Sequence, residues 1–423
     1  MLTMGRNALS WVRRVVTRAV LKRVGPRALS LLPEGALVPL RRDGVVPVPE
    51  LDRIADEGPI TQLPVPFGVT LWLVTGHDVV KQVLADTAHF SNDFAHLGKI
   101  LELEQNPGGL GFADPPVHTR LRKVLTPEFT MRRLARLAPR IDEIIADCLD
   151  SMAEAPGPVD LVEKFALPIP SLTICELLGV PYADREEFQR LAEARFDLFG
   201  GAGAGFGHIS ESLAYMHKVV AQQRRDPGDG LIGMIIREHG DEVTDEELAG
   251  LADGVLTGGF ETTASMIALG ALMLLGDDRH ATRLREDDSA VNPFVEEMLR
   301  YLTVVQVAFL RFAREDTVIA GQPVSAGDVV ALSLSAANRD PALGEGIREF
   351  DPTRAPNPHV AFGHGAHRCI GAELARMELR AAYPALVRRF PHLRLASDAP
   401  LTFRETSIVY GVEAIPVLTG PDL

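Results

Sequence analysis

The sequence has few cysteines, no long uninterrupted apolar run and a deficit of basic side chains. Three cysteines in 423 residues give no disulfide framework, so we expect a protein of a reducing cytoplasm. No run of 18 or more apolar residues is present, and nothing is predicted to span a membrane. A net charge of −14 argues against nucleic-acid binding, which requires a basic face.

The body of the chain has enough apolar material for one large core. Hydrophobic residues make up 46% of the sequence, and no change of composition divides residues 46–423, which we expect to form one domain. The first 42 residues carry nine basic side chains and one acid, Glu34, a net of +8. We therefore interpret residues 1–45 as a basic amphipathic extension. Its first 30 residues could contact an anionic membrane surface, pack on the acidic body or form an organelle presequence.

A glycine-punctuated loop presents one cysteine just before a long apolar-periodic segment, residues 372–390. Gly363, Gly365 and Gly371 permit positive φ and a close approach of the backbone to a flat partner. A thiolate at Cys369 would be stabilised by the free N–H groups at the start of the helix. A cysteine thiolate is also one of the few axial ligands that a haem iron takes from a protein.

Two alternatives for this loop stay open on its residues alone. A lone cysteine is usually a small buried hydrophobic residue. Zinc is the second alternative, because His359, His364 and His367 gather near Cys369. Structural zinc sites usually bring paired cysteines, however, and no C-x-x-C pair is present.

The loop closely resembles the cysteine-ligand loop of the cytochrome P-450 superfamily, Phe-x-x-Gly-x-x-x-Cys-x-Gly. Phe362, Gly365, Cys369 and Gly371 fill its fixed positions. The resemblance, which is strongest to the soluble bacterial class, implies a mainly α fold, a single α-rich domain with a small β-sheet region. It also implies haem b, buried between an oxygen-binding helix and the cysteine loop, with Cys369 as the axial ligand of the iron.

Residues 251–275 are apolar nearly all round and predict a buried helix. Two glycines, Gly258 and Gly259, and the acid Glu261 are costly there, because glycine weakens a helix interior by roughly 1 kcal/mol and a buried carboxylate needs partners. A threonine hydroxyl can bond the carbonyl four residues earlier and open a kink. The segment matches the P-450 oxygen-binding helix. By that resemblance Glu261 and Thr262 are the catalytic residues, which relay protons to dioxygen.

His118 and Arg122 are four residues apart and so share one helix face, where two donors suit a carboxylate pair. A solvated basic face would show the same pattern. In P-450 proteins the matching pair binds a haem propionate, and the resemblance places Arg311 and His367 there as well. It also assigns Phe362, Gly363 and Gly371 to the cofactor-binding loop.

Glu297 and Arg300 are three residues apart and meet on one helix face, next to an apolar run. On a surface such a pair contributes under about 1 kcal/mol. The resemblance adds Arg354 and implies a buried structural network of the three residues.

The resemblance also indicates an apolar, medium-to-large substrate of the fatty acid, terpenoid, steroid or polyketide type. The glycine-rich residues 200–207 predict a helix–helix connection, in the region that forms a mobile lid in the family. By family position the expected pocket residues are Phe94, Leu97, Phe196, Phe199, Val255, Gly259, Val305, Val307 and Ile408.

The expected function is that of a monooxygenase, which takes two electrons from outside, activates dioxygen and hydroxylates or epoxidises the substrate. A haem-binding sensor or carrier and a peroxide-driven haem-thiolate enzyme are the alternatives, and neither requires the Glu261–Thr262 relay. No flavin or nicotinamide fingerprint is present, so the electrons should come from a small iron–sulfur ferredoxin with its reductase. We expect that partner to dock on basic residues near the cysteine loop. The candidates are Arg120, Arg122, Lys123, Arg132, Arg133, Arg136, Arg368, Arg376 and Arg380.

Overall fold

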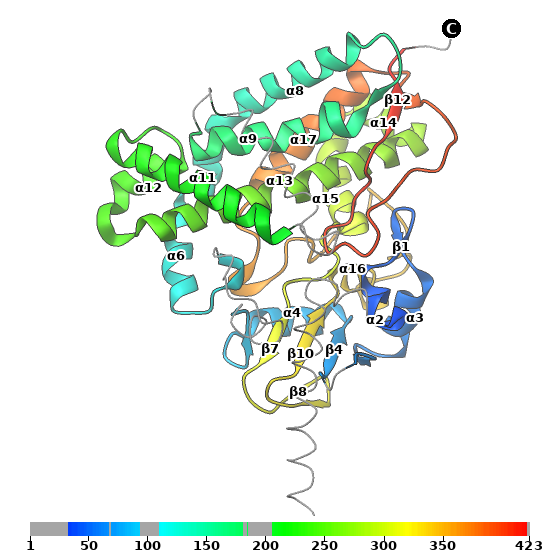
Figure 1. The fold of residues 1–423 in the computed structure, drawn as a ribbon. Coiled ribbons are helices and arrows are strands. Elements are labelled where there is room, and N and C mark those ends of the chain that lie inside the picture. The colour runs from blue at the N-terminus through cyan, green and yellow to red at the C-terminus, as the bar shows by residue number, and fades with distance from the viewer. Residues whose placement is uncertain (1–32, 67–68, 94–109, 181–183, 185–204, 421–423) are drawn as a thin grey trace, which may run out of the picture.

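The structure, a computed structural model, describes residues 33–66, 69–93, 110–180, 184 and 205–420. Most helices form one large layered body, and the strands β4, β7, β8 and β10 lie together at its lower end in Figure 1. The helices are α2 (Glu34–Leu37), α3 (Pro49–Glu57), α4 (His77–Ala85), α6 (Val117–Leu125), α7 (Met131–Leu134), α8 (Ala138–Ala153), α9 (Pro168–Leu178), α11 (Gly205–Arg225), α12 (Leu231–His239), α13 (Asp245–Gly276), α14 (Asp278–Glu286), α15 (Val291–Leu302), α16 (Leu334–Ala337) and α17 (Ala372–Arg389). The expected mainly α fold is confirmed.

The strands form small sheets. In the largest sheet the order is β3-β4-β10-β7-β5; β10 runs parallel to β4, and the remaining pairs are antiparallel. The strands are β1 (Arg42–Asp43), β2 (Val46–Pro47), β3 (Ile60–Leu63), β4 (Leu71–Val74), β5 (Phe90–Ser91), β6 (Val159–Asp160), β7 (Arg311–Ala313), β8 (Thr317–Ile319), β9 (Gln322–Val324), β10 (Val329–Leu332), β11 (Arg394–Leu395) and β12 (Pro416–Leu418).

Helix α13 is the centre of the helical body and packs against α9, α11 and α17. The apolar pattern predicted this helix from residue 251, whereas the structure starts it at Asp245. The reason is a capping box, in which the Thr244 hydroxyl accepts from the Glu247 N–H and the Glu247 carboxylate accepts from the Thr244 N–H. By length and apolarity α13 could cross a membrane, but 67% of its most apolar window is buried within the protein, as in a core helix.

Helix α17 crosses α13 in direct contact at a glycine. A Cβ atom at Gly270 would lie 2.0 Å from the Tyr383 hydroxyl oxygen, so no other residue fits there without a shift of the tyrosine. That hydroxyl donates a hydrogen bond of 2.6 Å to the Met266 carbonyl. The helix that contains Glu261 and the helix that follows Cys369 are therefore fastened to each other inside the core.

The start of the described chain packs against the body. Val38 and Leu51 are buried in one apolar cluster with Leu63, Leu73 and Val307. The boundary at residue 45 between an extension and the domain remains a prediction, and residues 1–32 lie outside the part of the chain that the structure describes.

Candidate active site

The cysteine loop is a tight turn just before α17. The Cys369 N–H donates to the Phe362 carbonyl at 2.8 Å, which closes the loop. Gly363 and Gly365 have φ of +67° and +71°, a region that glycine adopts without strain. A Cβ atom at Gly365 would also lie 2.8 Å from the Ala85 Cα atom in α4. The sequence therefore needs glycine at position 365 for both reasons.

The Cys369 side chain is solvent-accessible yet enclosed by dense protein on its other sides. This enclosure raises the pKa of the thiol. The N–H of Gly371 and the guanidinium groups of Arg122, Arg368 and Arg376 act in the opposite direction and lower that pKa. The loop and the helices α6 and α17 thus supply an N–H donor and three positive charges to a thiolate at this position.

The four residues expected to bind the propionates form a basic cluster. The His118 and His367 rings lie 4.0 Å apart, centroid to centroid, and both His118 and Arg311 are buried. Burial lowers the pKa of Arg311 to about 10. Burial and the neighbouring His118 and Arg311 lower the pKa of His367 to about 3. Arg122 is half-buried in the same cluster. Burial lowers the pKa of its guanidinium; a Cys369 thiolate raises this pKa and Arg368 lowers it.

This cluster fits a group that carries carboxylates. Both ring nitrogens of His118 are buried and have no hydrogen-bond partner among the described residues, although burial of such donors normally requires one. Arg311 Nη1 donates to the Phe309 carbonyl at 2.7 Å. With Cys369 nearby, these donors suit haem b, whose propionates need cations and whose iron needs a soft axial ligand.

The zinc alternative finds no support in the described part of the chain. No group of three or more His, Cys, Asp or Glu side chains there could hold a metal ion. His359 instead hydrogen-bonds to the Glu296 carboxylate at 3.1 Å.

The two expected relay residues lie at adjacent positions on α13 in different surroundings. The Thr262 hydroxyl donates to the Gly258 carbonyl at 2.7 Å, the bond to the carbonyl four residues earlier that the sequence suggested. Glu261 is buried, and its carboxylate accepts from Arg404 Nη1 at 2.7 Å. Arg404 Nη2 also donates to the Ser265 hydroxyl at 2.6 Å, one turn further along α13.

Arg404 is a functional candidate that the sequence analysis missed. It lies on a hairpin, residues 403–412, whose strands meet through the Phe403–Val412 bridge. A Cβ atom at Gly411 would lie 1.8 Å from Arg404 Nη2, so the guanidinium occupies the space that this glycine leaves. No local pattern announces the pair, because 143 residues separate Glu261 from Arg404.

The structure brings together the three residues of the expected buried network. Glu297 and Arg300 are fully buried and bonded through both carboxylate oxygens, at 2.6 and 2.7 Å. Arg354 Nε lies 3.7 Å from Glu297. Arg300 also donates to the carbonyls of Asn338 and Ile347, which anchors the segment that leads to the cysteine loop.

Three of the expected pocket residues lie on two paired segments. Val305 bridges Val409, and Val307 bridges Ser333. The Ile408 carbonyl accepts from the N–H of Gln306, between the two valines.

The remaining members of the expected pocket set are distributed as follows. Val255 is buried on α13. Gly259 packs on α9, where a Cβ atom would lie 2.6 Å from the Ile174 side chain, whereas a Cβ atom at Gly258 would meet open space; the pocket role of Gly259 remains a prediction. The other four lie outside the described residues. These are Phe94, Leu97, Phe196 and Phe199.

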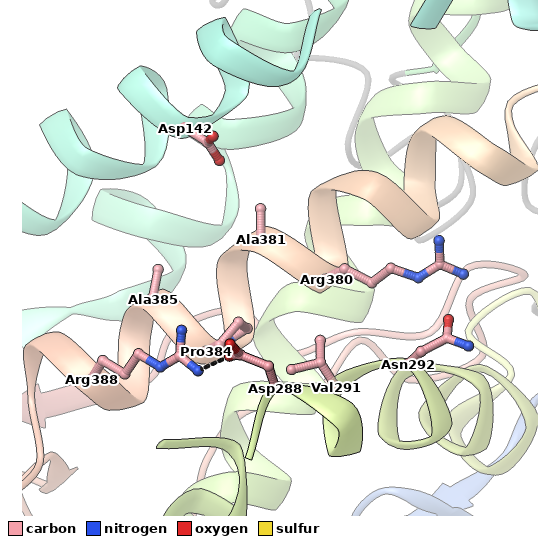
Figure 2. Close-up of a pocket in the computed structure, with 9 residues that line it drawn as sticks. All are labelled: Asp142, Asp288, Val291, Asn292, Arg380, Ala381, Pro384, Ala385 and Arg388. Atoms are coloured by element: carbon pink, nitrogen blue, oxygen red, sulfur yellow. Dashed lines mark hydrogen bonds and ion pairs between the residues drawn. The ribbon is translucent and has the colours of Figure 1, made fainter. Parts of the chain in front are cut away.

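A separate surface groove lies between α8, α17 and the start of α15, and Arg380 of the expected docking face lines it (Figure 2). Its arginines have acidic partners, because Arg388 pairs with Asp288 and Arg380 lies 3.5 Å from the Glu296 carboxylate.

Most arginines of the expected docking face are already paired. Arg133 contacts Glu128 and Glu238, and Arg376 binds Glu296 at 2.7 and 2.9 Å. Arg120 and Arg136 are paired as well, with Glu247 and Glu128. Lys123, Arg132 and Arg368 are exposed and have no ion pair within the described residues.

The sequence profile of the cytochrome P450 family matches residues 58–216 and 202–415. The chain therefore belongs to the cytochrome P450 family, a class of haem-dependent oxidoreductases.

Individual relatives are similar along nearly the whole chain. Cytochrome P450 165B3 of Amycolatopsis orientalis is 41% identical over 89% of this chain and 97% of its own. Cytochrome P450 monooxygenase PikC of Streptomyces venezuelae is 38% identical over 88% and 90%. The solved structure of P450 StaH, from the biosynthesis of a glycopeptide antibiotic, is 42% identical over 90% of this chain and all of its own, with a TM-score of 0.80.

Membership establishes the cofactor and the class of reaction. The protein binds haem b and is an oxidoreductase of the P450 monooxygenase class. Such enzymes need a redox partner, a substrate and dioxygen. Haem bound here would supply the iron on which dioxygen is reduced, and the residues of this chain would bind it and control the protons.

Proposed function

We propose that the enzyme hydroxylates or epoxidises an apolar small molecule, with Glu261 and Thr262 as the proton relay. The observation that carries this proposal is the acid–alcohol pair on α13, a central helix of the core. The bond to Gly258 fixes the Thr262 hydroxyl, while the Glu261 carboxylate lies buried beside Arg404. An acid and an alcohol at adjacent positions on one helix are the two groups that a proton relay requires.

In this proposal Cys369 is the axial ligand, and His118, Arg122, Arg311 and His367 bind the propionates. The unpartnered nitrogens of His118 support this assignment. Glu297, Arg300 and Arg354 hold the chain that leads to the cysteine, through a buried network.

The proposed substrate is apolar and medium to large: a fatty acid, a terpenoid or steroid, or a polyketide-like molecule. Val255, Val305, Val307 and Ile408 would supply an aliphatic wall for it. A peptide-derived substrate is the second candidate, supported by 42% identity to StaH, a P450 from glycopeptide antibiotic biosynthesis.

We also propose a small iron–sulfur ferredoxin with its reductase as the electron donor, and the cytoplasm as the location. The three cysteines are consistent with a reducing compartment, since Cys148 and Cys175 are buried singly in the core. Contact of residues 1–30 with a membrane surface remains part of this proposal.

A spectrum tests the ligand assignment first. The reduced holoenzyme under carbon monoxide should show the strongly red-shifted Soret band of a thiolate-ligated carbonyl, and Cys369→His should lose that shift. A globin-like band in the wild-type protein would contradict the assignment.

A screen of fatty acids, terpenoids, steroids, macrolides and aromatic peptides then tests the substrate class. The expected hit displaces water from the iron and shifts the Soret band. A response to peptides alone would replace the first substrate class with the second. Turnover with hydrogen peroxide as fast as with reduced ferredoxin would favour the peroxide-driven alternative.

A further inference from the structure

Gln306 is completely buried and connects segments from both ends of the chain. Its side-chain oxygen accepts from Arg42 Nε at 2.8 Å. Its side-chain nitrogen donates to the Leu40 carbonyl at 3.0 Å and to the Ser407 carbonyl at 2.7 Å. One amide therefore joins the chain next to β1 to the 403–412 hairpin, and its removal would leave two buried carbonyls without this donor.

The backbone of Gln306 strengthens the same junction. Its N–H donates to the Ile408 carbonyl at 3.0 Å, and its carbonyl accepts from the Leu334 N–H at 2.9 Å. Successive side chains of an extended segment point to opposite faces, so those of Val305 and Val307 point away from that of Gln306. Gln306 thus lies behind the proposed aliphatic wall and outside direct reach of a substrate.

Arg42 closes the junction on the other side. Its two terminal nitrogens donate to the Val45 and Thr303 carbonyls at 2.8 and 2.9 Å, and its guanidinium lies 4.8 Å from the centre of the Tyr410 ring. Burial lowers the pKa of Arg42 to about 10, so the group is still charged at neutral pH. A buried guanidinium depends on acceptors, and Gln306 supplies the one for Nε.

We propose that Gln306 is a positioning residue that fixes the spacing of the pocket wall and thereby its selectivity for ligand size. This side chain adds to the backbone bonds between the two segments of the wall, residues 305–307 and 407–409, and fastens them to Leu40 and Arg42 at the β1–β2 hairpin. The proposal rests on the proposed function, because it takes these segments to be the substrate wall. Gln306 itself touches neither substrate nor cofactor.

The test compares a small and a bulky azole on the holoenzyme, both followed by the Soret shift. Imidazole reports the iron and its cysteine ligand, whereas clotrimazole also needs the pocket wall. Gln306→Leu should leave the imidazole Kd within about twofold of the wild-type value. It should weaken clotrimazole about tenfold, or about 1.4 kcal/mol. Arg42→Ala should give the same pattern, because it loosens the same junction.

Gln223→Leu is the matched control. Gln223 is also a buried glutamine; it donates to the Gly179 carbonyl and accepts from the Gly228 N–H, both outside the wall. This variant should lose a comparable amount of thermal stability and keep both azole affinities. If Gln306→Leu lowered only the melting temperature, with the ratio of the two Kd values unchanged, the positioning role would be overturned.

A second variant and one wild-type measurement distinguish failure of the positioning role from failure of the proposed function. If Gln306→Leu fails to retain haem, Gln306→Glu replaces it: this side chain still accepts from Arg42 but cannot donate to the Ser407 carbonyl. The loss of clotrimazole affinity should persist in this variant, and wild-type affinity would overturn the proposal. A wild-type protein that shows no Soret shift with imidazole would instead contradict the proposed function.

Discussion

Glu261 of the central helix and Arg404 of the C-terminal hairpin form a buried ion pair with a separation of 2.7 Å. The same guanidinium donates to the Ser265 hydroxyl, so a residue of the hairpin holds the Glu261 carboxylate in place. A carboxylate held in this way must leave Arg404, or take a proton while still bound to it, before it can deliver one. In the proposed relay, the pair would therefore link the position of the hairpin to proton delivery.

Removal of Arg404 should affect both stability and coupling. Arg404→Ala leaves the Glu261 carboxylate buried without this partner, and loss of one member of a buried pair typically costs about 3–5 kcal/mol. Chemical unfolding should show the loss, and turnover should show less product per electron pair consumed. Arg404→Lys keeps a charge and should recover part of both quantities. Unchanged unfolding and coupling in the alanine variant would contradict the pairing.

Replacement of Thr262 tests the alcohol of the relay. Thr262→Ala should consume reducing equivalents with more hydrogen peroxide and less oxygenated product, since general acid–base groups typically contribute about 10²–10⁴-fold. The matched control is Thr257→Ala, because Thr257 makes the same type of bond to the Asp253 carbonyl on the same helix. A relay role requires uncoupling in the first variant only. Glu261→Gln should likewise slow turnover while haem content stays constant.

The rate of reduction by the proposed ferredoxin should depend on exposed basic residues that have no ion pair in the described structure. Charge reversal of Lys123 and Arg132 should slow reduction by ferredoxin on the order of tenfold at low salt and less at high salt. Reduction by dithionite should not change. Arg283→Glu on α14 is the control, because Arg283 is likewise exposed and has no ion pair within the described residues.

Two other arginines are unsuitable for this test. Reversal of Arg133 or Arg376 would break ion pairs with Glu128 and Glu296 and confuse docking with folding. Equal rates in the double variant and the wild type at every salt concentration would exclude this docking site.

Glu378 on α17 should make stability depend on pH. Burial raises its pKa from 4.5 to about 8, although the nearby Thr173 hydroxyl acts in the opposite direction. Between these values the folded state holds a proton that the unfolded state releases, so the free energy of unfolding falls as pH rises. Glu378→Gln removes this term and should gain up to a few kcal/mol over wild type at about pH 9, with little difference at about pH 4. Parallel curves for the two proteins would show that Glu378 does not titrate in this way.

Much of this site could be predicted from local patterns in the sequence. The cysteine loop depends on backbone conformations that only its glycines adopt freely, and α13 follows from its continuous apolar surface. Glu297 and Arg300 are three residues apart on one helix. Each of these features is encoded within one continuous stretch of the chain, so a sequence pattern is enough to predict it.

Contacts between distant segments could not be predicted in the same way. Arg404 and Glu261 are 143 residues apart, and Arg42 and Gln306 are 264 apart. No characteristic sequence spacing identifies either pair. The packing of Gly259 could not be predicted either, because only the position of α9 decides which of two adjacent glycines faces open space.

The interlock of Gly270 and Tyr383 has a practical consequence for redesign of the enzyme. The two helices that it joins form a stiff frame, because the tyrosine hydroxyl is tied to Met266 while its ring fills the notch at the glycine. A larger substrate therefore cannot gain room by spreading this frame. Substitutions intended to change the range of substrates should be made in the proposed wall, residues 305–307 and 407–409. Libraries that vary position 270 or 383 should return mostly unfolded protein.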